Sequence, residues 1–354
     1  MSDELSFNKI EVKPTQLVTN LVRCIRENLT PMVWGLPGIG KSEIIASIAK
    51  MYDLKLIDIR LTTCDITDLN GFPDNSGEKA TYKVFDTFPI ATDTPPINPE
   101  TNKPYSGWLV FLDELPSVSG AMQASAYKLI LDRMVGQHHL HPNCALLAAG
   151  NDTDHGAISY GMGTAAGTRM IHFNLVTDLD EWTKYGQTHG NVDSRIISFL
   201  NYRPELFHKF SLDSPDKTHP NPRTWKAVSK LISDTPTLTA ENDLAIIAGA
   251  VGTGAANEFI VYTEVYRDLV NFSDIEKSPL GCRVPSEAAN CYALTGIIID
   301  NTSPKNLDSV IKYSKRLSSE FQTLIIQGLI NKNSRYTEDD DFSDWMSDII
   351  IEIT

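Results

Sequence analysis

Residues 35–42 place three glycines, a lysine and a serine between two apolar runs. The stretch reads GLPGIGKS and fits the pattern G-x-x-x-x-G-K-[ST] of a phosphate-binding loop. Glycines let the backbone N–H groups turn toward an anion, and a helix that starts near Lys41 adds its positive end. Lys41 would reach the β- and γ-phosphates of ATP, and the Ser42 hydroxyl could bind Mg²⁺. The predicted nucleotide-binding residues are Gly35, Leu36, Pro37, Gly38, Ile39, Gly40, Lys41, Ser42 and Glu43.

Two adjacent carboxylates follow the apolar run in WLVFLDEL. Asp113 is predicted to join Ser42 in holding Mg²⁺, and Glu114 is predicted to polarise the attacking water as a general base. Two neighbouring carboxylates at the end of a buried strand are costly unless a cation or a water needs them. Together with the loop, they predict ATP hydrolysis, with Lys41 and Glu114 acting directly on the reaction.

Strands and helices must alternate to position these groups. The loop is preceded by an expected strand at 31–35 and followed by a helix at 42–54. The other elements expected before residue 178 are helices at 14–29 and 119–136, strands at 54–61, 107–115, 144–152 and 169–176, and a hairpin around 80–85. Apolar strands alternating with helices predict an α/β fold with a parallel five-stranded sheet covered on both sides.

The pattern becomes helical after about residue 178, which predicts two domains. Residues 1–178 would form the P-loop α/β nucleotide-binding domain, and 179–354 an all-helical lid with a C-terminal helical region. The helices expected in the second domain are 193–202, 222–234, 241–271, 285–301, 304–331 and a segment from 341. The last segment is expected to have a solvated acidic face and an apolar docking stripe, or else to bind a partner.

The charge of the chain limits its partners. A net charge of -14 argues against nucleic acid binding over the whole surface, because phosphate binding needs clustered Lys and Arg, although a local basic pore in an oligomer stays open. No apolar run approaches the ~20 residues of a membrane span, and the N-terminus lacks a signal-peptide pattern, so a cytoplasmic protein is expected. The five cysteines are widely spread and are expected to be reduced thiols. The sequence HHLH at 138–141 favours a solvated hairpin over a metal site.

The loop and the LVFLDE strand together resemble the AAA+ ATPases. The further motifs resemble the MoxR branch of that family, including versions in tailed-phage genomes, over residues 14–235. DIRLTTCDITDLNGFPD resembles the linker after the second strand in this branch. ALLAAGND resembles the strand that ends in the sensor-1 residue, here Asn151. In GTAAGTRMIHFNL, Arg169 lies where the family has its arginine finger, and HPNPRTWKAVSKL resembles the start of the sensor-2 helix, with Arg223 as the sensor.

This resemblance implies roles for three more residues. Asn151 would orient the attacking water, Arg169 would act on the nucleotide of a neighbouring subunit, and Arg223 would contact the γ-phosphate from the lid. In a purely structural interpretation, Asn151 forms a turn, Arg169 is a surface residue and Arg223 makes a salt bridge at the domain junction. The chain departs from cellular MoxR proteins in Gly-Asn-Asp at sensor 1 and Thr-Arg-Met at the finger. Arg133 is therefore a second candidate for the intersubunit arginine.

The resemblance also implies a function. MoxR-like proteins form rings, hexameric in the family, and remodel or chaperone a protein partner, often one with a von Willebrand factor A domain. A phage-encoded version would work in the host cytoplasm. The main rival is a nucleic-acid-directed motor or helicase loader, but the expected pore segments 64–90 and 116–125 contain only Lys79 and Lys83 as basic residues. A nucleotide-stabilised assembly module and a small-molecule kinase would also carry such a loop.

Overall fold

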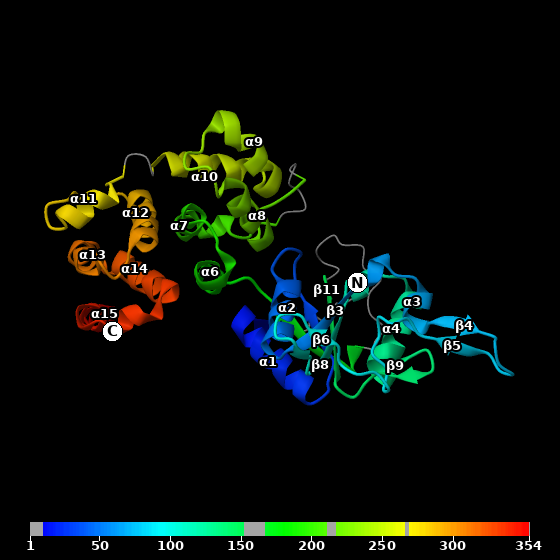
Figure 1. The fold of residues 1–354 in the computed structure, drawn as a ribbon. Helices are drawn as coiled ribbons and strands as arrows, with labels where there is room; N and C mark the ends of the chain where they lie inside the picture. Colours follow the sequence, from blue (N-terminus) through cyan, green and yellow to red (C-terminus); the bar gives the residue numbers. More distant parts are fainter. Residues whose placement is uncertain (1–9, 152–166, 211–216, 266–268, 354) are drawn as a thin grey trace. The chain divides into compact units, whose positions relative to one another are not determined.

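The computed structural model describes residues 10–151, 167–210, 217–265 and 269–353. The chain divides into two compact units, Met1–Thr177 and Asp178–Thr354. Figure 1 shows the elements of both units.

The first unit is built on a six-stranded sheet in the order β1-β12-β2-β11-β8-β3, and every pair of neighbours is parallel. The strands are β1 Glu11–Val12, β12 Ile171–Leu175, β2 Pro31–Trp34, β11 Cys144–Gly150, β8 Gly107–Asp113 and β3 Leu54–Arg60. This confirms the α/β class and the five predicted strands. The expected count of five is corrected to six, because β1, which pairs with β12, has only two residues and shows no periodicity.

Helices cover both faces of this sheet (Figure 1). Residues of β8 alternate between the faces. Leu109 and Phe111 pack in one core with α1 and α2, whereas Val110 and Leu112 pack in a second core with α3 and α4. The helices are α1 Pro14–Arg26, α2 Lys41–Met51, α3 Ile66–Asn70 and α4 Gly120–Asp132. The expected two-sided cover is thus present.

The first unit also contains small two-stranded hairpins outside the main sheet. They are β4 Phe72–Asp74 with β5 Thr81–Lys83, β6 Ile97–Asn98 with β7 Lys103–Pro104, and β9 Met134–Val135 with β10 His138–His139. The hairpins expected around 80–85 and at HHLH are therefore confirmed. The ring Nε2 of His138 lies 3.0 Å from the Tyr82 carbonyl oxygen and joins two of the hairpins. Within the described ranges, no group of three His, Cys, Asp or Glu residues could hold a metal ion.

The second unit is helical, as predicted, but two of the expected long helices are each divided into two shorter helices. The segment 241–271 contains α9 and α10, because Gly252 adopts a φ of 83° that ends the first helix. The segment 304–331 contains α13 and α14, separated by a turn at 315–318. Because the helical spacing of apolar residues continues across both breaks, the prediction from periodicity alone gave one helix in each segment. The helices are α6 Leu179–Tyr185, α7 Ser194–Tyr202, α8 Pro222–Ile232, α9 Ala240–Val251, α10 Thr253–Val265, α11 Phe272–Lys277, α12 Ala288–Asn301, α13 Leu307–Ser314, α14 Ser319–Lys332 and α15 Asp340–Ile353.

Two apolar clusters hold the helices of this unit together. One surrounds the fully buried Trp225 with residues of α7, α8, α9 and α10, and the other surrounds Trp345 with residues of α11 to α15. In α15, Phe342, Trp345 and Ile349 are buried while Asp341 is exposed. The expected combination of a docking stripe and a solvated acidic face is confirmed for this helix.

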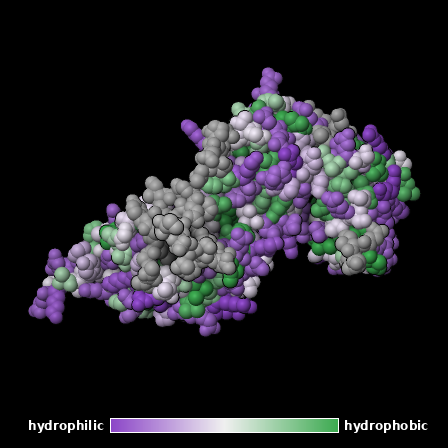
Figure 2. Space-filling view, turned by 180° about the vertical axis from the view of Figure 1, so that it is seen from behind, coloured by the Kyte–Doolittle hydropathy of each residue, from purple (hydrophilic) through white to green (hydrophobic). Residues whose placement is uncertain are grey.

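Among the described residues on the face drawn in Figure 2, hydrophobic groups form separate patches between hydrophilic ones. Searched over the described residues, the chain contains no helix long and apolar enough to cross a membrane. All five cysteines are free thiols, and burial raises the pKa of Cys144 to about 12. The expectation of unpaired cysteines is confirmed.

A buried amide should be essential to the second cluster. The Gln322 Oε1 accepts from the Trp345 indole at 2.7 Å, and its Nε2 donates to the Leu317 carbonyl at 2.8 Å. Gln322→Met leaves both groups buried without a partner, and we expect it to lower the free energy of unfolding by ~2–4 kcal/mol. Urea unfolding followed by circular dichroism measures this. Gln327→Met, in the same helix but exposed, is the matched control and should change stability little. Equal effects of the two changes would contradict the role of the amide.

Candidate nucleotide-binding site

The predicted phosphate-binding loop lies between β2 and α2. Gly40 caps the N-terminus of α2 with a φ of 97°, a conformation that only glycine adopts without strain. Ile39 is buried in the core beneath the loop, together with residues of β12 and α2, and so fixes the loop to the sheet. The backbone therefore delivers Lys41 and Ser42 at the first turn of α2, where unpaired N–H groups can bind an anion.

The Lys41 ammonium lies at the centre of the site. Its Nζ donates to the carbonyls of Gly35 at 2.6 Å and Leu36 at 3.0 Å, and to Asn151 Oδ1 at 2.8 Å. Lysine has three donors, and these contacts use all of them. The loop thus holds its cation in place before any phosphate binds. Asn151, predicted from the end of β11, is brought directly to the loop.

The two acidic residues occupy the end of β8, as predicted. The Glu114 N–H donates to Asp113 Oδ1 at 2.9 Å, which fixes the first carboxylate. Desolvation raises the pKa of Asp113, although the Glu114 N–H and the Lys41 charge act in the opposite direction. A desolvated carboxylate is stabilised by a nearby cation. Asp113 and the Ser42 hydroxyl are the two oxygen groups that could bind a Mg²⁺ ion, which takes one or two protein oxygens and completes its shell with water and phosphate.

Two groups at the end of β3 hold the Glu114 side chain. The Thr62 hydroxyl donates to Glu114 Oε2, and Arg60 Nε lies 3.8 Å from Glu114 Oε1. Glu114 itself has a left-handed backbone, with a φ of 61°. Neither Arg60 nor Thr62 was predicted from the sequence. In DIRLTT, Arg60 ends the strand and Thr62 follows it, but that these two residues meet Glu114 depends on the strand order, which the sequence alone does not give.

The strand order explains why these residues meet. β11 lies between β2 and β8, so Asn151 follows the strand that separates the loop from Asp113. β3 lies beside β8, and Arg60 is opposite Asp113 in the register. Because the strands are parallel, all their carboxyl ends open at one edge of the sheet, where α/β proteins bind ligands. Four sequence-distant segments therefore form one site.

Arg169 lies in the turn before β12 and is exposed. A hydrogen-bonded chain connects this turn to the loop. The Trp34 indole donates to His172 Nδ1 at 2.8 Å, so the imidazole carries its proton on Nε2, which donates to the Gly167 carbonyl at 2.7 Å. Trp34 is the last residue of β2 and directly precedes the loop. The turn that carries the predicted intersubunit arginine is thus tied to the loop of its own subunit.

The two remaining arginines differ in their surroundings. The Arg133 guanidinium donates a hydrogen bond to the Cys144 carbonyl of its own chain. This contact disfavours Arg133 as the intersubunit arginine. Arg223 is the second residue of α8 and is exposed. It belongs to the second unit, and its approach to the loop stays a prediction.

No protein-family model matches the sequence, and no curated protein matches it. Solved structures to which the chain is similar include a candidate ATPase from Cytophaga hutchinsonii, at 10% identity and a TM-score of 0.34, over 98% of this chain and 91% of that one. A mutant RuvB of Thermotoga maritima has 14% identity and a TM-score of 0.39, over 75% and 73% of the chains. NtrX of Brucella abortus, in complex with ADP, has 13% identity and a TM-score of 0.35, over 94% and 65%. At such scores these likenesses carry no argument, and the fold class rests on the chain's own sheet and loop.

Removing the lysine should weaken the binding of phosphate groups by the loop. Lys41→Ala removes charge-assisted hydrogen bonds worth ~1.5–3 kcal/mol, so we expect ATP to bind ~10–100-fold more weakly. Titration with a fluorescent ATP analogue measures the affinity. Lys50→Ala is the matched control, because Lys50 is in the same helix but exposed and paired with Glu100. Unchanged binding in the Lys41 variant would place the nucleotide elsewhere.

Proposed function

We propose that this protein is an AAA+ ATPase that hydrolyses ATP at the interfaces between its own copies. The observation that carries the proposal is the set of contacts made by Lys41, which joins the loop carbonyls to Asn151 at the edge where Asp113 and Glu114 end β8. A kinase of small molecules needs the loop, but it would not need Asn151, Arg169 and Arg223 together.

The residues of the site would divide the chemistry between phosphate binding and proton transfer. The loop N–H groups and Lys41 bind the phosphates and stabilise the charge that develops on the transferred group. Ser42 and Asp113 would hold Mg²⁺, which neutralises phosphate charge. Glu114 accepts the proton of the attacking water. Thr62 and Arg60 orient this carboxylate, whose two oxygens still have acceptor positions for the attacking water.

The finer proposal is a MoxR-like ring, hexameric as in that branch, that remodels a protein partner such as one with a von Willebrand factor A domain. The motif series from 14 to 235 and the exposed Arg169 and Arg223 support it. Arg169 would complete the site of the neighbouring copy, and Arg223 would close the helical lid on ATP. The net charge of -14 disfavours the rival function of a nucleic-acid motor.

The general base can be tested by turnover and assembly together. We expect Glu114→Gln to lower phosphate release ~10²–10⁴-fold while ATP still binds. Light scattering of this variant with ATP and Mg²⁺ should then show an oligomer that persists, since hydrolysis no longer resets it. Glu27→Gln, at an exposed carboxylate after α1, is the control and should keep full turnover. Full turnover in the Glu114 variant would remove this residue from the mechanism.

The intersubunit arginine can be tested by mixing two inactive proteins. We expect Arg169→Ala to lose ~10³–10⁵-fold of turnover while keeping nucleotide affinity. Lys41→Ala is impaired for a different reason, since it binds ATP ~10–100-fold more weakly but retains its arginine. In a mixed ring, the intact loop of one protein meets the arginine of the other, so phosphate release should partly return. A monomer that hydrolyses ATP normally without Arg169, or a mixture that stays inactive, would contradict action between copies.

A further inference from the structure

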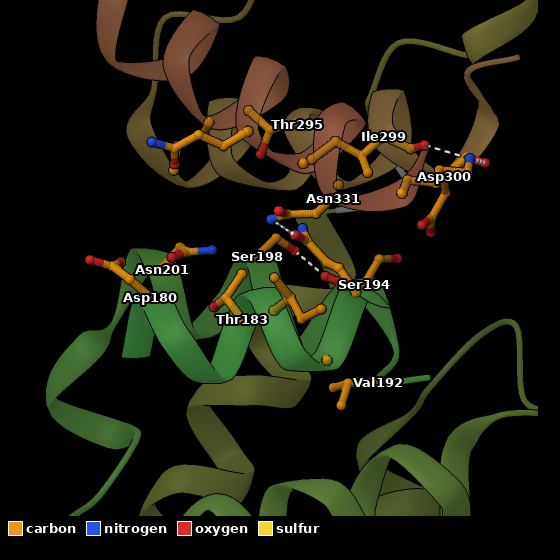
Figure 3. A pocket seen from close by; sticks show the side chains of 18 of the residues that line it. Asp180, Thr183, Val192, Ser194, Ser198, Asn201, Thr295, Ile299, Asp300 and Asn331 are labelled. Atoms are coloured by element: carbon orange, nitrogen blue, oxygen red, sulfur yellow. Dashed lines mark hydrogen bonds between the residues drawn. The ribbon is translucent and has the colours of Figure 1, made fainter. Parts of the chain in front are cut away.

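The second unit contains a cavity of about 290 Å³ between two walls of helices. One wall is formed by α6, the π-helical turn η4 at Gly186–Gly190, and α7, and the other by α12 and α14 (Figure 3). Asn331 Nδ2 donates to Gln187 Oε1 at 2.9 Å and joins the two walls in the middle. The cavity is thus bridged by side chains of the chain itself, and the connection that bears on the proposed reaction lies in the first unit.

In the first unit, one imidazole connects the nucleotide-binding loop to the turn that carries Arg169. His172 is the second residue of β12, and Trp34 is the last residue of the neighbouring strand β2. His172 lies opposite Met32, two positions before Trp34, and alternate residues of a strand share a face, so the two rings project from the same side of the sheet. The rings are nearly parallel, with an interplanar angle of 16° and a centroid distance of 6.0 Å.

Both nitrogens of the His172 ring form hydrogen bonds. An indole N–H can only donate, so Nδ1 accepts from Trp34 at 2.8 Å and the ring proton is on Nε2, which donates to the Gly167 carbonyl at 2.7 Å. The same carbonyl accepts from the Met170 N–H at 3.4 Å, which closes the turn. The imidazole therefore provides the shorter of the two bonds at this oxygen, and only one of its two tautomers can do so.

The turn is held on both sides of Arg169. Gly167, which precedes it, is bound by His172, and Met170, which follows it, is only 4% exposed and packs in the core shared with α4. The Arg169 side chain itself is exposed. A fixed backbone lowers the entropy that this side chain loses when it contacts a group of another molecule.

We propose that His172 is a positioning residue that holds Arg169 where the nucleotide of a neighbouring copy can meet it. This inference rests on the proposed action between copies. His172 is exposed, so its two bonds are not needed to fill the core. The loop has supports of its own, since Lys41 binds two of its carbonyls and Ile39 is buried beneath it, whereas the turn depends on the bond from the imidazole.

His172→Phe keeps a flat ring and removes both nitrogens. We expect phosphate release to fall ~10–10²-fold, the effect of a small displacement of a positioned group. The affinity for a fluorescent ATP analogue should stay unchanged, because the loop keeps its own supports. His139→Phe, at an exposed histidine of the same unit, is the matched control and should keep full turnover.

Mixing assigns the effect to one side of the interface. His172→Phe mixed with Lys41→Ala, at an ATP concentration that saturates only the intact loop, should regain part of the turnover, because an intact loop then meets a well-placed arginine. His172→Phe mixed with Arg169→Ala should gain nothing, since neither protein supplies such an arginine. A role of His172 in its own loop gives the reciprocal pattern, with weaker ATP binding, and that result would overturn the proposal.

Two amide variants separate the two hydrogen bonds of the ring. The amide of His172→Gln can reach the place of Nε2 and donate to Gly167, whereas that of His172→Asn reaches only the place of Nδ1, where it can accept from Trp34. His172→Gln should therefore retain more turnover than His172→Asn. The opposite order would show that the bond to the turn is not the one that matters.

The proposed function and this inference fail in different ways. Full turnover in Arg169→Ala removes action between copies, and the role of His172 with it. If Arg169→Ala is inactive and is restored by Lys41→Ala while His172→Phe keeps full turnover, the inference alone is wrong.

Discussion

An ammonium group that leaves water must find acceptors, and the first unit is arranged around this requirement. The Lys41 cation is satisfied by two carbonyls of its own loop and by Asn151 from a strand more than a hundred residues later. These bonds hold the loop in a curled form and tie β2 to β11. Phosphate oxygens can bind only by replacing some of them. Nucleotide binding therefore partly replaces one set of hydrogen-bond acceptors with another. The net binding free energy is smaller than the number of new contacts implies.

The general base Glu114 is also held by groups of its own chain. Glu114 is held by Thr62 and Arg60 at the end of the adjacent strand, so both the cation and the carboxylate of the site are paired within the chain. Ligand binding, a neighbouring copy or a movement of β3 could each shift the balance of these pairs. These contacts within the chain hold the reacting groups near one another and restrain them.

Local patterns in the sequence were enough to predict one part of the site. A glycine-rich loop between a strand and a helix, and acids after an apolar strand, need only a few neighbouring residues to be recognised. Arg60 and Thr62, the bond between Lys41 and Asn151, and the cavity of the second unit could not be predicted, because they depend on which strands and helices become neighbours in space. The prediction gave α9 and α10 as one helix because the helical spacing of apolar residues continues across Gly252. It missed β1 because two residues are too few to show the alternation of a strand.

The hydrogen bond of Trp34 has a consequence for how the loop can be observed. The indole is the last side chain before the loop, and its N–H is bound to an imidazole that is also anchored to the turn carrying Arg169. Indole emission is sensitive to such a bond. The chain has five tryptophans, so the contribution of this one is the difference between the unchanged chain and Trp34→Phe. That difference signal would report the state of the loop directly, without a label and without waiting for a product.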